Sequence, residues 1–373
     1  MRYFIITFGC QMNKSDSERI ALILEQKGYK PALKINGADL IVVNMCSVRQ
    51  SAVDRVYGLI PKFQKLKTKN KKVKTILTGC ILKKDEKKFQ KSFDLILDIK
   101  NLQNWPKYLE KESYSLFQPW HNYGVSYLRI TPKYKTNSLA YVPISNGCNN
   151  FCTYCVVPFT RGPLICRDHE EILREVKRAV SPIRNTISNG AREIWLLGQN
   201  VNDYTSPGNS LINFPKLLKM VNDIPGKFVI RFTSPNPKNF SDELIKVMAE
   251  SKKIAKFLNL PVQSGDNEIL KKMNRPYTVE QYKDLVKKIR EKIPNINLST
   301  DVIVGFPEET KKQFQNTAKL FKEMKFNIAY IAKYSPRPGT AAFKMKDDVP
   351  REEKEKRWKD LNDLILKNKN DVK

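Results

Sequence analysis

A short loop with three cysteines restricts most strongly what this chain can build. Cys148, Cys152 and Cys155 are spaced as Cys-x3-Cys-x2-Cys behind Gly147. A loop this tight can direct three thiolates at one centre, as a metal ion or an iron–sulfur cluster requires. Three ligands leave a tetrahedral or cuboidal centre with one open position. The spacing alone is equally compatible with an iron–sulfur cluster and with a structural zinc ion that a distant residue such as His169 completes.

The first third of the chain alternates strand and helix patterns. Ser15-Asp16-Ser17-Glu18 has the form of a capping box that opens a helix reaching about Lys27, and Arg49–Lys65 can form a second helix. Strands are predicted at Tyr3–Phe8, Leu40–Asn44, Val73–Thr78 and Leu95–Leu97. This alternation predicts a small parallel α/β sheet.

Three of these strands are each followed by a cysteine. Cys10, Cys46 and Cys80 come directly after strand ends, about one strand–helix unit apart. The carboxyl ends of parallel strands meet at one edge of a sheet, so the fold should gather the three thiols there. Scattered buried cysteines are the alternative, because free cysteine is often buried. We predict a second site with three thiolates and an open position.

The second part of the chain repeats the strand and helix alternation. Strands are predicted at Ala140–Ser145, Glu193–Leu197, Phe228–Phe232, Phe257–Leu260, Leu298–Val304 and Ile328–Lys333. This pattern predicts a partial (β/α)6 barrel whose ligands bind at the carboxyl ends of the strands. The cysteine loop follows the first of these strands and therefore lies at the predicted binding end.

The charge balance points to a polyanionic partner. Lys and Arg together number 67 against 38 for Asp and Glu, a net charge of +29. Such an excess favours nucleic acid as a partner, although a lysine-rich proteome would also produce it. The dense lysine stretches Lys62–Lys74 and Lys83–Lys91 are either solvated helix faces or parts of an RNA-binding surface.

Nothing in the sequence predicts export or membrane insertion. No apolar run is long enough to span a bilayer, and the strand-like start Met1–Thr7 lacks the features of a signal peptide. We therefore expect a cytoplasmic protein. Its 7 cysteines then favour metal binding or catalysis over disulfides.

The cysteine loop carries a resemblance to a known superfamily. With the aromatic Tyr154 just before Cys155, it resembles the signature of radical S-adenosylmethionine (SAM) enzymes. The resemblance implies that Cys148, Cys152 and Cys155 hold a 4Fe–4S cluster whose open iron binds SAM. It also implies cleavage of SAM to a 5′-deoxyadenosyl radical, chemistry that belongs to the cofactor.

A narrower resemblance covers most of the chain. Gly9-Cys10-Gln11-Met12-Asn13, Asn44-Met45-Cys46 and Thr78-Gly79-Cys80 are similar to segments of the radical SAM methylthiotransferases. The Gln-Met-Asn form resembles the branch that acts on isopentenyl-adenosine in tRNA. The resemblance implies that Cys10, Cys46 and Cys80 hold a second 4Fe–4S cluster. It assigns no catalytic side chain, because the radical is generated at the SAM cluster.

The same resemblance implies a set of residues that line the SAM pocket. They follow or end barrel strands, where a glycine lets the backbone approach a ligand closely and otherwise marks a simple turn. These residues are Tyr154, Gly198, Gln199, Asn200, Gln263, Ser264, Asp301 and Gly305.

The chain also departs from the family pattern. Asn236 and Asn259 stand where the family often has histidine, and Cys166 has no obvious partner and is interpreted as a structural thiol. The family usually continues into a small RNA-binding TRAM domain, whereas here a charged helix at Val349–Leu366 precedes the end of the chain. The predicted domains are a methylthiotransferase domain at 1–115, a linker at 116–138, the radical SAM domain at 139–345 and a charged helix at 346–373 without a TRAM domain.

These observations together predict a tRNA-modifying enzyme. It would insert a methylthio group at carbon 2 of N6-isopentenyladenosine next to the anticodon, using two SAM molecules and two 4Fe–4S clusters. The alternatives are a non-catalytic iron–sulfur or zinc protein that binds RNA, and a methylthiotransferase for threonylcarbamoyl-adenosine tRNA or ribosomal protein S12. Expected partners are the tRNA, an electron donor and a sulfur or cluster donor, and the protein is expected to be a monomer.

Overall fold

The chain folds into two compact units. The computed structural model describes residues 1–48, 50–109, 114–116, 126–132, 134, 138–181 and 190–370. One unit comprises Met1–Asn149 and Val156–Arg192, and the other comprises Asn150–Cys155 and Glu193–Lys373. We call them the N-terminal unit and the C-terminal unit. The domain boundaries expected from the sequence stay a prediction.

A six-stranded sheet organises the N-terminal unit. Its strands lie in the order β2-β1-β3-β4-β5-β6, and every adjacent pair is parallel. The predicted parallel sheet is thus confirmed, with β2 and β6 as strands that the sequence did not indicate. The strands are β1 (Arg2–Thr7), β2 (Lys30–Pro31), β3 (Leu40–Cys46), β4 (Lys74–Cys80), β5 (Leu95–Leu97) and β6 (Tyr114–Leu116).

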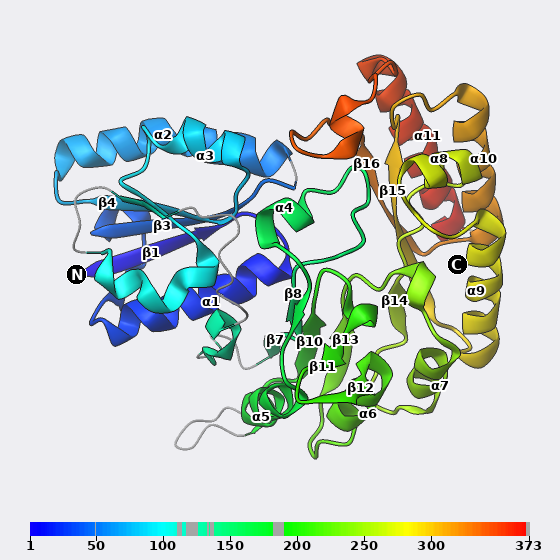
Figure 1. Ribbon diagram of the computed structural model, residues 1–373, viewed down its shortest axis with the longest axis horizontal. Coiled ribbons are helices and arrows are strands. Elements are labelled where there is room, and N and C mark those ends of the chain that lie inside the picture. Colours follow the sequence, from blue (N-terminus) through cyan, green and yellow to red (C-terminus); the bar gives the residue numbers. More distant parts are fainter. Residues whose placement is uncertain are drawn as a thin grey trace. The chain divides into compact units, whose positions relative to one another are not determined.

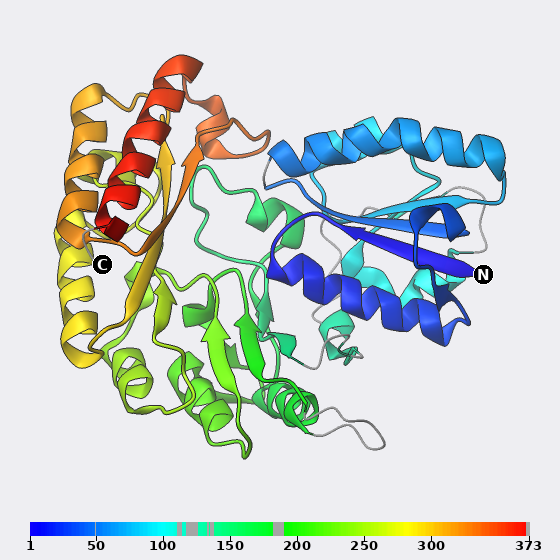
Figure 2. The same cartoon turned by 180° about the vertical axis from the view of Figure 1, so that it is seen from behind.

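Helices cover both faces of this sheet (Figures 1 and 2). Helix α1 (Gln11–Gln26) and the 3-10 segments η2 (Ile99–Lys107) and η3 (Ser126–Arg129) pack on one face. Helices α2 (Gln50–Lys69) and α3 (Lys83–Phe89) pack on the other. Successive strand residues point to opposite faces, so Val42 enters the first core while Ile41 and Val43 enter the second. Burial on both faces explains the continuous apolar run in β3.

Helix α1 begins earlier than the sequence suggested. The predicted start at Ser15 is wrong, because the helix starts at Gln11 with Cys10 as its N-cap. Ser15 and Asp16 of the supposed capping box are fully buried and have partners far along the chain instead. Ser15 Oγ donates to the Tyr141 carbonyl at 3.2 Å, and Asp16 pairs with Arg161 at 2.7 Å. Tertiary contacts, and not a helix cap, account for these residues.

A buried ion network ties α1 to the rest of the N-terminal unit. Glu175 of α5 (His169–Val180) receives one bond from Arg19 at 2.9 Å and another from Arg167 at 2.7 Å. All three side chains are almost completely buried. The unit also contains β7 (Leu139–Pro143), β8 (Ser145–Asn146), α4 (Val157–Arg161) and β9 (Ile165–Cys166), with β8 and β9 antiparallel.

The predicted linker falls only partly on described residues. Positions 117–125, 133 and 135–137 lie outside the described part of the chain. Within the described part, Tyr127 and Leu128 of η3 are fully buried in the core that α1 covers. This segment therefore contributes to the packing of the N-terminal unit.

The C-terminal unit contains two parallel strand groups. Strands β10 (Glu193–Leu197) and β13 (Val229–Phe232) pair with each other, and β14 (Phe257–Asn259), β15 (Asn297–Val304) and β16 (Ile328–Lys333) form a second sheet. These strands form within one residue of their predicted positions. A small antiparallel pair, β11 (Thr205–Ser206) and β12 (Asn209–Asn213), is additional.

Helices follow these strands. Figures 1 and 2 show α9, α10 and α11 along one side of the sheet that β15 and β16 form. The predicted C-terminal helix forms as α11, where Leu361 and Ile365 are buried. The helices of this unit are α6 (Phe214–Asn222), α7 (Asp242–Glu250), α8 (Asn267–Lys272), α9 (Val279–Lys292), α10 (Lys311–Met324) and α11 (Arg351–Asn370). No helix in the described part of the chain is long and apolar enough to cross a membrane.

Candidate metal centres

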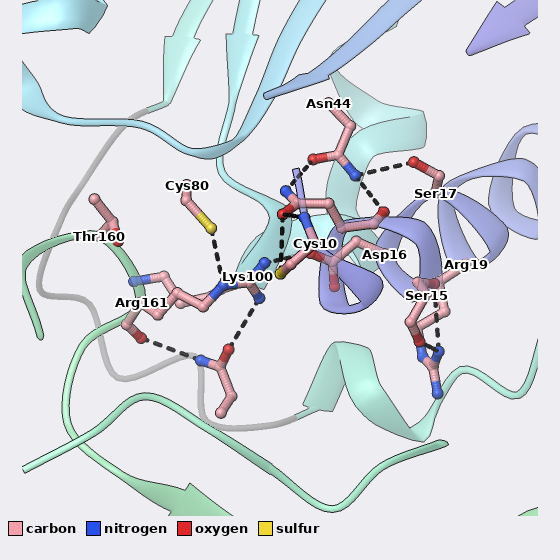
Figure 3. A network of polar contacts seen from close by, with 12 residues as sticks. Cys10, Ser15, Asp16, Ser17, Arg19, Asn44, Cys80, Lys100, Thr160 and Arg161 are labelled. Carbon is pink, nitrogen blue, oxygen red and sulfur yellow. Dashed lines mark hydrogen bonds and ion pairs between the residues drawn. The ribbon is translucent and has the colours of Figure 1, made fainter. Parts of the chain in front are cut away.

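The start of α1 fixes Cys10 beside the end of β3 (Figure 3). Asn13 Oδ1 accepts a hydrogen bond from the Cys10 backbone N–H at 3.3 Å, which caps the helix. Asn13 Nδ2 donates to Asn44 Oδ1 at 3.0 Å, and Asn44 Nδ2 donates back to the Asn13 carbonyl at 2.8 Å. Both asparagines are fully buried. This reciprocal pair links the helix that carries Cys10 to the strand that ends in Cys46.

Cys46 and Cys80 lie opposite each other at the ends of neighbouring parallel strands. Their backbones are in register between β3 and β4, and both side chains are buried, whereas Cys10 is exposed. A hydrogen bond with Cys46, and then burial, raise the pKa of the Cys80 thiol well above its ordinary value. A metal or cluster must displace this proton to bind the pair as thiolates. The strand ends therefore gather the three cysteines at one edge, as the sequence predicted.

The N-terminal site offers three cysteine sulfurs as donors. In the described residues, no three Cys, His, Asp or Glu side chains converge as a single metal ion would need. A 4Fe–4S cluster has four irons, so its cysteines bind different metal atoms and need not meet at one point. Three sulfur donors are the ligands that such a cluster prefers. The residues present therefore fit a 4Fe–4S cluster held by Cys10, Cys46 and Cys80.

A buried arginine adjoins this triplet. Arg161 ends α4 and donates from Nε to Cys80 Sγ at 3.0 Å and from Nη2 to Asp16 Oδ2 at 2.7 Å. Its Nη1 donates to the Tyr127 hydroxyl and to Asn146 Oδ1. Figure 3 shows the guanidinium between Cys80 and the start of α1. Although burial would lower it, the Asp16 charge holds the pKa of Arg161 well above its usual value, so this cation stays charged.

Gly79, directly before Cys80, occupies a position where only glycine fits. It has φ of +107°, and a Cβ there would lie 2.3 Å from the Met45 carbonyl and 2.5 Å from Asn44 Oδ1. We expect Gly79→Ala to cost about 1–3 kcal/mol of stability from backbone strain alone, with the clash adding to it. Thermal unfolding of the purified variant measures this loss. Gly58→Ala in α2 is the control, because open space surrounds that glycine and alanine favours helix by up to about 1 kcal/mol.

The Cys148–Cys155 loop is held in place by hydrogen bonds to its backbone. In the C-terminal unit, Thr153 N–H donates to the Met273 carbonyl at 3.1 Å, and the Thr153 carbonyl accepts from Ala342 N–H at 2.8 Å. Asn274 Nδ2 donates to the carbonyls of Asn150 and Phe151, both at 3.1 Å. In the N-terminal unit, Cys148 N–H donates to the Gly162 carbonyl at 3.2 Å. The binding of one cluster by Cys148, Cys152 and Cys155 stays a prediction from their spacing.

Tyr154 packs beside this loop. Its ring contacts a core cluster that includes Met273, Phe306 and Tyr334. Burial raises the pKa of its hydroxyl well above the ordinary value, so Tyr154 is neutral. Nearby, Arg275 donates from Nη1 to Cys152 Sγ at 3.5 Å and from Nε to the Tyr277 hydroxyl at 2.9 Å. The loop thus carries a packed aromatic ring, Tyr154, and adjoins a buried cation, Arg275.

The other predicted SAM-lining residues lie at strand ends in the C-terminal unit. Gly198, Gln199 and Asn200 follow β10, and Asn200 is buried with no hydrogen-bond partner for Nδ2 among the described residues. Gln263 has a left-handed φ of +71° and bridges to β15 through its backbone. Such placement at the carboxyl ends of strands is compatible with a ligand site.

Three of these predicted residues already have structural partners. Ser264 is fully buried beside Thr317, and its Oγ accepts from Asp266 N–H. Asp301 Oδ2 accepts from Asn259 Nδ2 at 2.8 Å. Gly305 donates its N–H to Glu309, and a Cβ there would collide with the side chain of Lys354. Their contact with SAM stays a prediction.

Sequence reasoning gave no role to the two arginines beside the sulfurs. No periodicity in the sequence marks Arg161 or Arg275 as buried. The signal that could have found Arg161 is Asp16, a carboxylate on the buried side of α1 that needs a cation. Cys166 lies in β9 opposite Ser145, and its role as a structural thiol stays a prediction.

Two family models match the parts of the chain that contain the two cysteine triplets. The sequence model of the Radical SAM superfamily matches residues 142–321, which include the Cys148–Cys155 loop. The model described as Uncharacterized protein family UPF0004 matches residues 2–98, which include Cys10, Cys46 and Cys80. These matches and the α/β architecture define a radical SAM protein with an additional N-terminal cysteine domain.

Closely similar relatives specify the family. The tRNA-2-methylthio-N(6)-dimethylallyladenosine synthase of Carboxydothermus hydrogenoformans is 42% identical over 370 residues, covering 97% of this chain and 82% of the relative. The synthase of the same name from Clostridium novyi is 41% identical over 372 residues, covering 98% and 81%. The chain belongs to the family of tRNA-2-methylthio-N(6)-dimethylallyladenosine synthases, whose cofactors are SAM and 4Fe–4S clusters.

Solved structures share the fold at low identity. The radical S-adenosylmethionine methyltransferase TsrM from Kitasatospora setae, with cobalamin and a [4Fe-4S] cluster bound, has a TM-score of 0.63 at 14% identity and matches 91% of this chain and 76% of its own. The cobalamin-dependent S-adenosylmethionine radical enzyme OxsB has a TM-score of 0.58 at 13% identity and matches 98% and 56%. These likenesses confirm the predicted fold class.

Proposed function

We propose that this protein adds a methylthio group to carbon 2 of N6-isopentenyladenosine next to the anticodon of tRNA, using SAM and two 4Fe–4S clusters. The observation that supports it is the arrangement of Cys10, Cys46 and Cys80 at neighbouring strand ends, combined with the radical SAM loop. A radical SAM enzyme needs only the loop. We infer that the additional triplet serves the insertion of sulfur.

The residues of the chain divide the work between two sites. Cys148, Cys152 and Cys155 would hold the cluster that binds SAM, and Cys10, Cys46 and Cys80 would hold the cluster from which sulfur is delivered. When bound, these groups supply a 5′-deoxyadenosyl radical, a methyl group and sulfur. The protein positions the cysteines, keeps Arg161 and Arg275 charged beside them, and must receive an unstacked base.

The decisive experiment combines metal analysis with nucleoside mass spectrometry. Anaerobically reconstituted protein should contain about eight irons and eight sulfides, and changing Cys10, Cys46 and Cys80 together to Ala should halve both values. The wild-type enzyme, given reductant, SAM, a sulfur source and tRNA bearing isopentenyladenosine, should form the 2-methylthio nucleoside. Stoichiometric zinc in place of iron, or reaction only with other tRNA or a ribosomal protein, would overturn the proposal.

Further partners follow from this chemistry. The reaction needs a one-electron donor for the SAM cluster and a sulfur or cluster donor that restores the second site, because sulfur leaves in the product. Because the proposed substrate is tRNA, we expect the enzyme to act in the cytoplasm. We further expect it to act as a monomer.

Exposed lysines suggest where tRNA could bind. Helices α2 and α3 cover the same face of the N-terminal sheet (Figure 1). Most of their lysines and of those just after them are exposed, and such a basic face attracts phosphates. We call this set the lysine face: Lys62, Lys65, Lys69, Lys71, Lys72, Lys83, Lys84, Lys87, Lys88 and Lys91.

The lysine face predicts a salt-dependent affinity. If about five phosphates are contacted, a fourfold rise in salt should weaken tRNA binding roughly 500-fold. Changing Lys83, Lys84, Lys87 and Lys88 to Gln should reduce this salt dependence, as measured by fluorescence anisotropy with labelled tRNA.

A charge-matched control separates a specific face from overall charge. Lys311, Lys312, Lys322 and Lys325 are also exposed, but they lie on or beside α10 in the C-terminal unit. Changing them to Gln should alter the salt dependence much less. Equal effects of both sets would show that the lysine face has no special part in binding.

A further inference from the structure

Each compact unit places one buried arginine against one proposed cysteine ligand. In the N-terminal unit, Arg161 Nε lies 3.0 Å from Cys80 Sγ. In the C-terminal unit, Arg275 Nη1 lies 3.5 Å from Cys152 Sγ. The two arginines are only 4% and 8% exposed. Burying a cation is costly, so two such placements beside sulfur require an explanation.

The two arginines differ in what balances their charge. Arg161 forms an ion pair with Asp16 at 2.7 Å, and Asp16 itself is fully buried. Arg275 has neutral partners: the Tyr277 hydroxyl at 2.9 Å and the Pro261 carbonyl at 3.3 Å. Among the ion pairs of the described residues, none involves Arg275. Asp16 therefore compensates the positive charge beside Cys80, whereas no acidic side chain in the described part of the chain forms an ion pair with the one beside Cys152.

A charge next to a ligand sulfur changes how easily the cluster accepts an electron. Reduction makes the cluster more negative, so a nearby cation or an N–H donor to sulfur stabilises the reduced form and raises the reduction potential. A nearby carboxylate has the opposite effect. These effects are strong in a buried site, because little solvent screens them.

We propose that Arg275 and Arg161 are positioning residues that set the reduction potentials of the two clusters in different ways. Arg275 raises the potential of the SAM cluster through a full positive charge. Arg161 acts on the second cluster mainly through its hydrogen bond to Cys80, because Asp16 balances the charge. The arrangement favours an incoming electron on the cluster that must cleave SAM. The proposal rests on the cysteine assignments made under the proposed function.

The SAM cluster is tested in isolation first. Changing Cys10, Cys46 and Cys80 to Ala leaves only the other cluster in the full chain, and a potentiometric titration followed by electron paramagnetic resonance measures its potential. Arg275→Met should lower that potential by at least about 59 mV, which for one electron is a tenfold change in the ratio of reduced to oxidised cluster. Arg275→Lys, which keeps the charge, should have a potential close to that of the parent. An unchanged potential in Arg275→Met with full iron content would overturn this part.

For the second cluster, the direction of the shift in reduction potential provides the test. With Cys148, Cys152 and Cys155 changed to Ala, Arg161→Met should lower the potential of the remaining cluster, whereas Asp16→Asn should raise it. The double variant Arg161→Met with Asp16→Asn should have a potential between those of the two single variants and below that of the parent, because it loses both charges and also the hydrogen bond to Cys80. A purely structural pair would not shift the potential in opposite directions. Shifts of the same sign for both single variants would contradict the proposal.

Iron content separates failure of this proposal from failure of the assignments beneath it. If either cysteine background binds no iron before an arginine is changed, the ligand assignment is wrong. If the background holds its cluster and the arginine variants leave the potential unmoved, the assignment stands and the tuning role is wrong. Should Arg275→Met lose iron, Arg275→Gln keeps N–H donors without the charge, and a lowered potential is again the expected result.

Discussion

The Cys152→Ala enzyme should form no detectable 5′-deoxyadenosine, whereas the Cys46→Ala enzyme should still form it but transfer no sulfur. Cys152 belongs to the loop that is predicted to hold the SAM cluster, and Cys46 ends β3 in the N-terminal sheet. Loss of the Cys152 thiolate removes the site where SAM is cleaved. Loss of the Cys46 thiolate leaves that site in place. Liquid chromatography of 5′-deoxyadenosine and mass spectrometry of the digested tRNA measure the two half-reactions separately.

An isotope label tests the same division of labour. Deuterium at carbon 2 of the target adenine should appear in 5′-deoxyadenosine made by the wild-type enzyme. Cys166→Ala is a matched control, because Cys166 is a cysteine outside both triplets and should leave both half-reactions intact. Product formation with the deuterium retained in the RNA would contradict hydrogen removal by the radical. Loss of 5′-deoxyadenosine in Cys46→Ala would contradict the separation of the sites.

Glu175→Gln should cost about 3–5 kcal/mol of stability, because it leaves two buried arginines without their counter-charge. Glu175 is fully buried and pairs with both Arg19 and Arg167. For a unit of this size the loss corresponds to a fall in unfolding temperature on the order of 10 °C. Differential scanning calorimetry, which resolves separate transitions of the two compact units, measures it.

At acid pH the wild-type protein should lose its greater stability relative to Glu175→Gln. Burial alone would raise the pKa of Glu175, but Arg167 and Arg19 hold it below the ordinary value. The stabilisation is therefore complete above the unfolded pKa of about 4.3 and is lost as the pH falls through the lower folded value. Glu250→Gln is the control, because its pair with Lys246 is exposed and should change stability by less than about 1 kcal/mol at any pH.

The elements of the fold were predictable where burial alone decides them. The apolar run Leu40–Asn44 identified β3 because both faces of that strand are covered. The start of α1 was not predictable in the same way. Ser15 and Asp16 have the composition of a helix cap, and only their distant partners Tyr141 and Arg161 show that they serve tertiary contacts. Local patterns do not contain such long-range contacts.

The candidate sites show the same limit. Spacing and position after a strand were enough to single out all six proposed cysteine ligands, because loop length and position within a strand–helix repeat are local properties of the sequence. The Asn13–Asn44 pair and the arginines beside Cys80 and Cys152 could not be foreseen. Each joins segments that are far apart in the chain, and the burial that gives it meaning exists only after folding.

The register of β3 and β4 also bears on the order of folding and metal loading. Cys46 and Cys80 face each other only when these two strands are aligned, and Cys10 joins them only when β1 has paired with β3. Parallel strands are joined through crossovers, so their contacts form late compared with local helices. Iron that needs all three sulfurs can enter only after the central sheet is complete. Iron bound at this edge would then stabilise the correctly aligned sheet against unfolding, because it binds only the folded state.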